Sequence, residues 1–503
     1  MRNQIQLLAL TAILFEATSS LTAQSSEPSV TYADLNPSHA TSSEGNGVAM
    51  GQSAGWADVA TAIIYGYEFP TVHAALWSET AHSFVDLHPG GYTNLEFLGS
   101  SPPVPYPLET LHPGWPTWSC LSSTSGDQQA GVVAYGSPAG YFEDFPLHAA
   151  LWSGTPDSFV DLHPAGYMNS WAYATSGRQQ VGIVCRSYLF AGSYAALWSG
   201  SAASFQNLNP IGAEVSGATS ISGNQQAGWV YFSGKVGGNP RAAIWFGTAD
   251  SFVDLHPAGA SASTVLSTSG TQQGGKVTYR LTDHAAIWSG TAASFVDLNP
   301  PGALASSVGA TTGSEQVGYV DVAGGHHAGI WFGTADSFVD LHAILPSSYY
   351  SGSEAHAIWK DGYTIKVLGV ADVIDAGVTH AMQWTIRLPD KVPPVITRAW
   401  ASQNILWPPN RRMVEIRLNA LVEDDSGKTT WRIVGACSNE PEYDAQDVEI
   451  LSAAQIRLRA ARCGNAEERI YTVLLQAEDA AGNLSGTEAV DVVVPHDARR
   501  GTR

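Results

Sequence analysis

The stretch His284-Ala285-Ala286-Ile287-Trp288-Ser289-Gly290-Thr291, followed at 294–300 by Ser-Phe-Val-Asp-Leu-Asn-Pro, decides the fold because it recurs along most of the chain. Its tryptophan returns at Trp77, Trp152, Trp198, Trp245, Trp288, Trp331 and, in a degenerate copy, Trp384. Four successive spacings are 46, 47, 43 and 43 residues. A period in this range, made of short strands, is typical of a propeller or repeat array rather than of an enzyme with one core.

One repeat divides into four predicted strands, at 260–268, 275–280, 284–288 and 294–298. Turn sequences separate them, Gly-Thr-Gln-Gln at 270–273 and Ser-Gly-Thr-Ala at 289–292. Four short strands joined by turns form one antiparallel sheet, which cannot bury both of its faces alone. Stacking such sheets around a ring buries both faces and protects their edges.

The two ends of the repeat region predict that the ring closes on itself. Residues 32–37 match the fourth strand but follow no third strand, whereas residues 380–384 match the third strand and precede no fourth. The two half copies would complete one shared sheet. Because seven tryptophan strands are present, we predict a seven-bladed β-propeller over residues 30–388.

One interval is longer than the others. Trp77 and Trp152 are 75 residues apart, and the excess lies at about 88–118. This segment contains several prolines and a half copy of the repeat at 111–114, without a tryptophan phrase of its own. We interpret it as an inserted loop; an eighth, degenerate blade is the alternative.

The repeat ends after Trp384, and a different pattern follows. A proline-rich linker occupies 389–394, and alternating strands with turns fill 395–497. About 100 residues of this kind suit an immunoglobulin-like β-sandwich. The predicted fold class is therefore all-β, a seven-bladed β-propeller followed by an immunoglobulin-like β-sandwich, with a disordered tail at 498–503.

The N-terminus has the pattern of a secretory signal peptide. Arg2 precedes an apolar stretch at 5–15, and Leu21-Thr22-Ala23 is a plausible cleavage site, so we assign residues 1–23 to the signal. The apolar stretch is too short to span a bilayer, and no later segment approaches the required length. We expect a secreted or extracellular protein without a membrane span, in which a periplasmic location stays open.

Charge excludes one class of partner. The chain has 24 Lys and Arg against 45 Asp and Glu, a formal net charge of −21. Such a surface repels phosphate backbones, so we predict no nucleic-acid binding.

The repeat resembles the HAF family of bacterial extracellular repeats. The matching text is the His-Ala-Ala-Leu-Trp phrase at 148–152 with its copies, and the Gly-x-Gln-Gln-x-Gly turn at 223–228. The resemblance covers about 30–388 and implies export and a repeat fold, but no activity. Tyr194 and Arg241 depart from it, since they replace the histidine of the phrase. The tail resembles an immunoglobulin-like module of bacterial secreted proteins, through its text at 406–410, 438–441, 479–483 and 494–497; such modules serve as spacers or adhesive units.

The repeated histidines at His73, His148, His284, His327 and His380 raise the question of a metal site. Equivalent positions on adjacent sheets lie about 10 Å apart, whereas metal–nitrogen bonds are about 2 Å long. We therefore expect each histidine to bond within its own blade or to the next. The Asp-Leu-His phrases at 86–88, 161–163, 254–256 and 340–342 carry Asn instead of His in other copies, which indicates a turn-forming role.

The remaining motifs do not predict a catalytic site or a metal site. The Gly-x-Ser-x-Gly text at 51–55 lies inside a repeat without a following helix, so we interpret it as coincidence. Acidic clusters at 423–425 and at 478–479 with Asn483 offer calcium-type oxygen ligands, but solvated turns are the favoured interpretation. We predict no catalytic residue, no metal and no cofactor.

The aromatic residues of the insertion are the candidate binding site. Tyr106, Trp115 and Trp118 lie on or beside a proline-stiffened loop, where rings can form a platform for a ligand; packing of the loop itself is the alternative. Cys437 and Cys463 are a candidate disulfide in an oxidising compartment.

The predicted function is a secreted, non-enzymatic recognition or adhesion scaffold that binds an extracellular glycan or protein. A polysaccharide-acting enzyme with a site at the propeller axis and a structural envelope or matrix component are the alternatives. Fold alone does not choose among them. Near-interchangeable repeats favour the scaffold.

Overall fold

A computed structural model of the chain describes residues 28–64, 67–89, 116–135, 146–187, 192–232, 239–425, 427–440, 447–464 and 468–497. The predicted signal peptide, the predicted tail and most of the predicted insertion lie outside these residues. Its contacts divide the chain into two compact units, Val30–Ile386 and a second unit that contains the residues from Arg387 onward. We describe each unit by itself.

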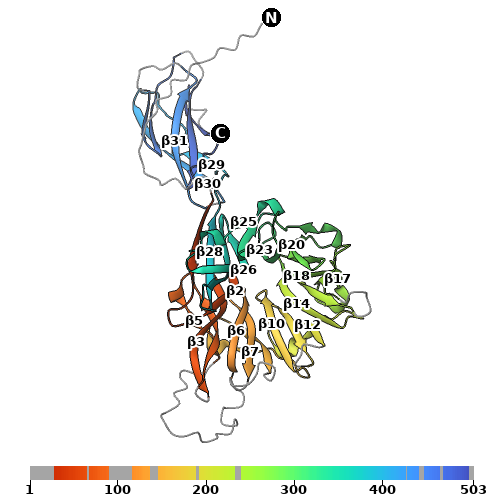
Figure 1. The fold of residues 1–503 in the computed structure, drawn as a ribbon. Coiled ribbons are helices and arrows are strands. Elements are labelled where there is room, and N and C mark those ends of the chain that lie inside the picture. Colours follow the sequence, from red (N-terminus) through yellow and green to blue (C-terminus); the bar gives the residue numbers. More distant parts are fainter. Residues whose placement is uncertain are drawn as a thin grey trace. The chain divides into compact units, whose positions relative to one another are not determined.

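The first unit consists of four-stranded antiparallel sheets in a repeated order (Figure 1). Sheet one contains β2 (Ser43–Ala49), β3 (Gln52–Ile64), β4 (Tyr67–Trp77) and β5 (Val85–Asp86); sheet two contains β6 (Pro116–Thr124), β7 (Gln129–Tyr135), β8 (Leu147–Trp152) and β9 (Val160–Asp161). Sheet three contains β10 (Asn169–Thr175), β11 (Gln180–Cys185), β12 (Ser193–Trp198) and β13 (Gln206–Asn207); sheet four contains β14 (Val215–Ser222), β15 (Gln225–Tyr231), β16 (Arg241–Trp245) and β17 (Val253–Asp254).

Three further sheets continue the series. Sheet five contains β18 (Ala262–Thr268), β19 (Gln273–Tyr279), β20 (Thr282–Trp288) and β21 (Val296–Asp297); sheet six contains β22 (Ala305–Thr311), β23 (Gln316–Val322), β24 (Gly325–Trp331) and β25 (Val339–Asp340). The closing sheet has the order β1 (Ser29–Asp34), β28 (Thr379–Arg387), β27 (Thr364–Val373) and β26 (Tyr350–Asp361). Single 3₁₀ turns precede the fourth strands at Ala81–Ser83, Pro156–Ser158, Ala202–Ser204, Ala249–Ser251, Ala292–Ser294 and Ala335–Ser337, and another spans His342–Ile344.

Sheet five shows how the repeated phrase produces this structure. Gln273 lies opposite Trp288 across β19 and β20, and the tryptophan is completely buried. A Cβ atom on Gly275 would lie 2.0 Å from the carbonyl oxygen of Thr264 on β18, so the glycine of the Gln-Gln-x-Gly phrase permits this close strand approach. The phrase therefore supplies both a turn and the closely packed middle of the sheet.

The first strands of the sheets surround the axis of the unit. Each contacts the first strand of the next sheet, from β2 through β6, β10, β14, β18 and β22 to β26, and β26 contacts β2 in turn. The short fourth strands lie at the outer edge of each sheet. Side chains of the first strands are consequently those nearest the axis.

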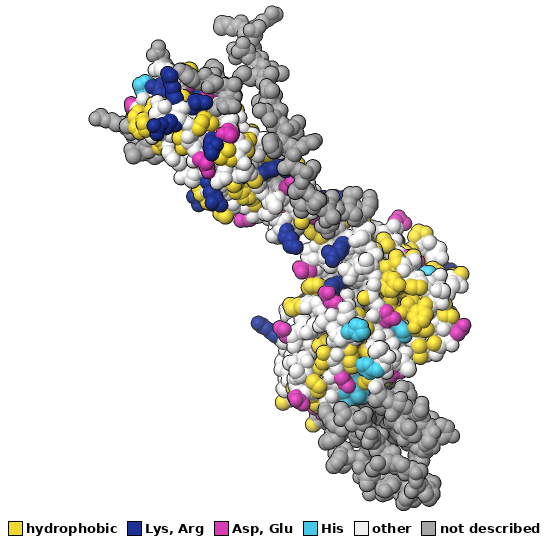
Figure 2. Space-filling model, turned by 90° about the vertical axis from the view of Figure 1, so that its left-hand side faces the viewer, with side chains coloured by type: hydrophobic (Ala, Val, Ile, Leu, Met, Phe, Trp, Pro, Cys, Tyr) yellow, Lys and Arg dark blue, Asp and Glu magenta, His cyan; other side chains and the backbone are white. Residues whose placement is uncertain are grey.

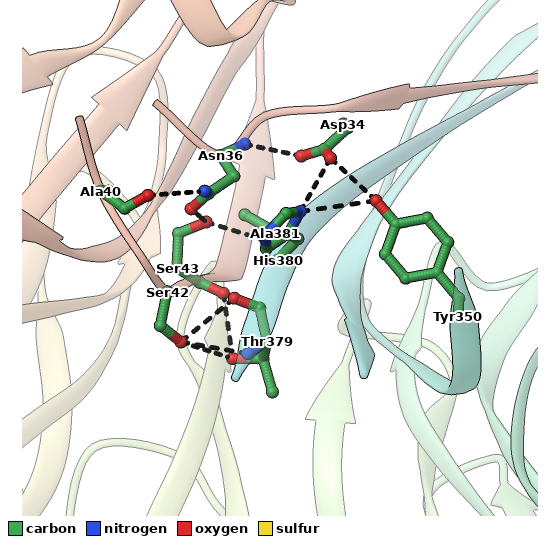
Figure 3. Close-up of polar contacts among 9 residues, drawn as sticks. All are labelled: Asp34, Asn36, Ala40, Ser42, Ser43, Tyr350, Thr379, His380 and Ala381. Carbon is green, nitrogen blue, oxygen red and sulfur yellow. Dashed lines mark hydrogen bonds and ion pairs between the residues drawn. The ribbon is translucent and has the colours of Figure 1, made fainter. Parts of the chain in front are cut away.

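The closing sheet joins the two ends of the unit, as the half copies predict. β1 is its outer strand, and the backbone N–H of Leu35 donates to the carbonyl oxygen of Ala381 at 2.8 Å. Asp34 accepts hydrogen bonds from the Tyr350 hydroxyl at 2.8 Å and from His380 Nδ1 at 2.8 Å (Figure 3). Strands from opposite ends of the unit thus share one sheet.

The second unit is also all-β. One sheet has the order β29 (Val395–Ala401), β30 (Met413–Glu423), β33 (Gln455–Arg459) and β32 (Val448–Ser452); the other has the order β31 (Thr429–Ser438), β34 (Arg469–Asp479) and β35 (Glu488–Val494). Alternating residues from both sheets form one buried core, which includes Ile416, Ile456, Tyr471 and Val473. Among the described residues of the chain, no helix is long and apolar enough to cross a membrane.

Candidate functional site

The repeated histidines bond within their own sheets. Nδ1 of His148 lies 2.7 Å from Oδ2 of Asp161, and Oδ1 of Asp161 accepts the backbone N–H of His163 at 2.8 Å. Burial raises the pKa of Asp161, but the hydrogen bonds from His148 and His163 outweigh it and lower the pKa. The same His–Asp contact occurs at His73–Asp86, His284–Asp297, His327–Asp340 and His380–Asp34.

In copies that lack the histidine, the residues at the two positions of the His–Asp pair still match in charge. Arg241 replaces it in sheet four, and its Nε donates to Asp254 Oδ2 at 2.9 Å. Tyr194 replaces it in sheet three, where the partner position holds the uncharged Asn207. Charge is therefore matched within each copy, which supports a structural role.

A buried serine then connects each sheet to the next. In sheet three, Ser170 Oγ lies 2.8 Å from Nδ1 of His163 and accepts the backbone N–H of Ala149 at 2.8 Å. Ala149 belongs to β8 of sheet two, and His163 follows β9, the last strand of that sheet. The rings of His163 and His148 stack with centroids 4.0 Å apart. We call this serine with its His or Asn partner the clip.

The clip occurs at every junction between the sheets of the first unit. The pairs are Ser43–Asn36, Ser119–His88, Ser170–His163, Ser216–Asn209, Ser263–His256, Ser306–Asn299 and Ser353–His342. At the closing junction, Ser43 Oγ accepts from Ala381 and donates to Asn36 (Figure 3). These serines are buried, and Asn replaces His freely, so the Ser–His–Asp groups hold sheets together and are not catalytic triads.

The copies differ from one another at two positions just beyond the clip serine. The residues one and three positions after it are Glu44 and Asn46, Cys120 and Ser122, Trp171 and Tyr173, Gly217 and Thr219, Thr264 and Leu266, Ser307 and Gly309, and Glu354 and His356. Carboxylates and imidazole occur at these positions only in sheet one and the closing sheet. These first strands are neighbours, so the repeat breaks its symmetry at one place near the axis.

At this place two glutamates flank one imidazole. Nδ1 of His356 lies 3.5 Å from Oε1 of Glu44, and Nε2 lies 3.6 Å from Oε2 of Glu354. Nδ1 also lies 3.0 Å from the carbonyl oxygen of Gly45, and Trp56 Nε1–H donates to Glu44 Oε2 at 3.2 Å. All three titratable side chains are half-buried.

The charges continue into sheets six and five. His326 pairs with Asp321, and its ring lies edge-on to that of Tyr319 with centroids 5.3 Å apart. Burial, followed by the charges of Asp321, Glu354 and Asp283, raises the pKa of Tyr319 to about 12. We call the set the acidic arc: Glu44, Asp283, Tyr319, Asp321, His326, Glu354 and His356.

The protonation of the acidic arc follows from its contacts. The adjacent imidazole of His356 lowers the pKa of Glu354 despite burial. Burial lowers the pKa of His356, but the adjacent carboxylates of Glu354 and Glu44 raise it overall. Within the described residues, these groups are not spaced closely enough to bind one metal ion together.

An open hollow of about 560 Å³ lies at the hairpins of sheet five, sheet six and the closing sheet. It is lined by Ser269, Thr311, Thr312, Ser314, Ile358, Trp359, Lys360 and Gly362. Its cation, Lys360, is bound to the buried Glu315 at 2.7 Å. At the preceding junction, Gln272 bridges to Thr311 at 2.6 Å and to Gln316 at 2.8 Å. The Glu315–Lys360 ion pair takes the place of such a bridge, so it stabilises a junction between sheets.

The structure describes only some of the predicted site residues. Trp118 lies in β6, half-buried, and its ring meets that of Trp171 edge-on with centroids 6.2 Å apart. Tyr106 and Trp115 lie outside the described residues. Cys437 and Cys463 are exposed, and they are not bonded to each other in this structure.

Comparisons with known proteins concern the fold alone. No protein-family model and no curated protein matches the chain. The β-propeller domain of the Trilobed protease from Pyrococcus furiosus is 7% identical, with a TM-score of 0.40, and the match covers 70% of this chain and 97% of that one. Acylaminoacyl peptidase from Pyrococcus horikoshii is 9% identical, with a TM-score of 0.40 and coverage of 66% and 50%. Puromycin hydrolase is 12% identical, with a TM-score of 0.36 and coverage of 76% and 59%.

The chain is an all-β protein of many four-stranded antiparallel sheets, and its repeat architecture is propeller-like. The expectation of a non-enzymatic recognition or adhesion scaffold was wrong, because these structural neighbours include propellers of peptidases. That expectation was drawn from the regularity of the repeats. Regular repeats do not separate a scaffold from an enzyme, because one fold hosts unrelated functions.

Proposed function

We propose that the first unit is a seven-bladed propeller closed by β1, at about 30–388, and that the second is an immunoglobulin-like module at 395–497 after a linker at 389–394. The ring of first-strand contacts and the shared closing sheet support the former. Two packed antiparallel sheets around one core support the latter. The signal-like N-terminus and the HAF-type repeat support export.

For this propeller we propose a peptidase-related function, in which the acidic arc binds a peptide through a cationic group. The observation that carries the proposal is the convergence of Glu44 and Glu354, from two different sheets, on His356. In other sheets the equivalent positions hold no carboxylate. Carboxylates form strong charge-assisted hydrogen bonds with ammonium and guanidinium groups, which peptides carry at their N-termini and at Lys and Arg.

The charge of the whole unit favours such a ligand. Residues 30–386 contain 26 Asp and Glu but only 8 Lys and Arg. On the face that Figure 2 shows, acidic and histidine side chains lie together on this unit while Lys and Arg are few. A field of one sign raises the local concentration of oppositely charged ligands and speeds their association.

The same groups provide acid–base chemistry for amide hydrolysis. Glu354, with its lowered pKa, is an ionised base that can accept a proton from water. The raised pKa of His356 favours its protonated form, which can donate a proton to the leaving amine. The two side chains are in contact, so the proposed base and acid both belong to the acidic arc, and Glu354 is also one of the two carboxylates proposed to bind the cationic group.

Cleavage of fluorogenic peptides tests this proposal. We expect the purified protein to cleave peptides with basic residues in preference to matched acidic and neutral peptides. A Glu44→Gln/Glu354→Gln variant should lose that activity. Glu214→Gln, which removes an exposed carboxylate outside the acidic arc, should retain it. Absence of cleavage by the unaltered protein, or equal cleavage by the double variant, contradicts the proposal.

A further inference from the structure

Three carboxylates from distant parts of the sequence meet in the second unit. Asp390 precedes β29, Asp424 follows β30 and Asp479 ends β34. One carboxylate oxygen of each lies within 4.8 Å of the others. We call this group the three-aspartate cluster.

Burial makes this cluster different from a solvated acidic turn. Asp390 is 8% exposed and Asp479 is 5% exposed. Asp390 Oδ1 accepts the backbone N–H of Val392 at 2.9 Å, but its buried Oδ2 has no hydrogen-bond partner among the described residues. A buried carboxylate oxygen without a partner is costly, so it requires a ligand that the protein does not itself supply.

Hydrogen bonds hold the cluster in place. Asp479 Oδ1 accepts the backbone N–H groups of Ala481 and Asn483, each at 2.8 Å. Asn483 Nδ2 donates to Asp479 Oδ2 at 2.8 Å and to the carbonyl oxygen of Asp390 at 3.1 Å. Asn483 therefore ties the segment of Asp390 to the end of β34, and the two carboxylates are fixed near each other without a cation between them.

We propose that Asp390, Asp424 and Asp479 bind one Ca²⁺ ion. Three negative charges at this distance repel one another in a buried site unless a cation is present. Calcium takes six to eight oxygen ligands at about 2.3–2.6 Å, so two ligand oxygens on opposite sides of the ion lie about 4.8 Å apart. Backbone carbonyls and water complete the coordination. The ion fixes the segment of Asp390 to the strand ends of the second unit.

Calorimetric titration of the full protein, after treatment with a chelator, tests the site. We expect one Ca²⁺ per chain, with a dissociation constant of about 10⁻³ M or below, and a higher melting temperature with Ca²⁺ than with chelator. Mg²⁺ should bind more weakly, because it requires shorter bonds and stricter geometry. No Ca²⁺ binding and an unchanged melting temperature overturn the proposal.

Asparagine variants assign the ligands while keeping one side-chain acceptor. Asp390→Asn and Asp479→Asn should each weaken Ca²⁺ binding about tenfold or more. Glu423→Gln removes an exposed carboxylate beside the cluster and should bind as the unaltered protein does. Asp479→Asn can also disturb folding, because Asp479 accepts hydrogen bonds from the turn that follows it. In that case the Ca²⁺ affinities of Asp390→Asn and Asp424→Asn test the assignment of the ligands. Equal affinity in these variants and in Glu423→Gln contradicts the assignment.

Discussion

His356 Nδ1 on β26 lies 3.5 Å from Glu44 Oε1 on β2, so the last and first sheets of the ring meet through an imidazole and a carboxylate. Across the other junctions the repeat places uncharged side chains at these positions. The junction between the first and last sheets is thus also the junction at which the repeats carry charged side chains at these positions.

The Glu354–His356 contact predicts a pH window of stability. The pKa of His356 is raised above 6.5 in the folded protein. Its contribution to the free energy of unfolding is therefore full below pH 6.5 and is lost as the pH rises through the pKa of the folded protein. The pKa of Glu354 is lowered below 4.5, so its contribution is present above that pH and is lost as pH falls. Thermal melts should show the largest destabilisation by Glu354→Gln at about pH 5–6.5. A pH-independent difference contradicts the ion pair.

Removal of a clip serine should destabilise the first unit. Ser170→Ala leaves the buried backbone N–H of Ala149 and Nδ1 of His163 without their partner, which costs about 1–3 kcal/mol. Chemical denaturation measures this free energy of unfolding. The exposed Ser289→Ala is the control and should change it by less than about 0.5 kcal/mol. Equal effects would show that the clip contributes nothing.

The other half of the clip predicts a rescue. Asn209 and Asn299 accept the serine hydroxyl in their own copies, at 2.6 Å each. His163→Asn should therefore be less destabilising than His163→Ala, which supplies no acceptor. The comparison again uses the free energy of unfolding. Equal destabilisation of the two variants would show that the side-chain hydrogen bond between residue 163 and Ser170 does not stabilise the fold.

Loss of Asp34 should weaken the ring at its closing sheet. Asp34→Ala removes the acceptor shared by His380 and Tyr350, and we expect a cost of about 1–3 kcal/mol. Hydrogen exchange should show reduced protection in β1 and β28 first. Asp250→Ala, an acidic residue of a 3₁₀ turn that touches no closing contact, is the control. Unchanged protection of β1 would contradict a role of Asp34 in closure.

The repeats predicted the sheets because each copy contains its own turns, its glycine and its buried tryptophan, as sheet five shows at Gly275 and Trp288. Shared use of β1 followed from the unmatched half copies. The acidic arc was missed because Glu44, Glu354 and His356 form no sequence motif. Aligning the copies on the clip serine would have revealed them as the charged exceptions.

Long-range packing brings together residues that no local pattern connects. The binding role of Trp118 stays a prediction, and its ring contact with Trp171 depends on the approach of β6 and β10. The acidic residues Asp424 and Asp479 were each noticed as calcium-type ligands. Asp390 was not, because it sits alone in a proline-rich segment until the fold brings it to the other two.

Affinity for a charged peptide and its neutral isostere tests the central claim most directly. Calorimetry should show that a lysine peptide binds the unaltered protein about 10–100-fold more tightly than the same peptide with acetyl-lysine, because a hydrogen bond between charged groups contributes about 1.5–3 kcal/mol. In Glu44→Gln/Glu354→Gln this preference should disappear, and in Glu214→Gln it should persist. Equal binding of both peptides by the unaltered protein, or a preference that survives in the double variant, would contradict the account.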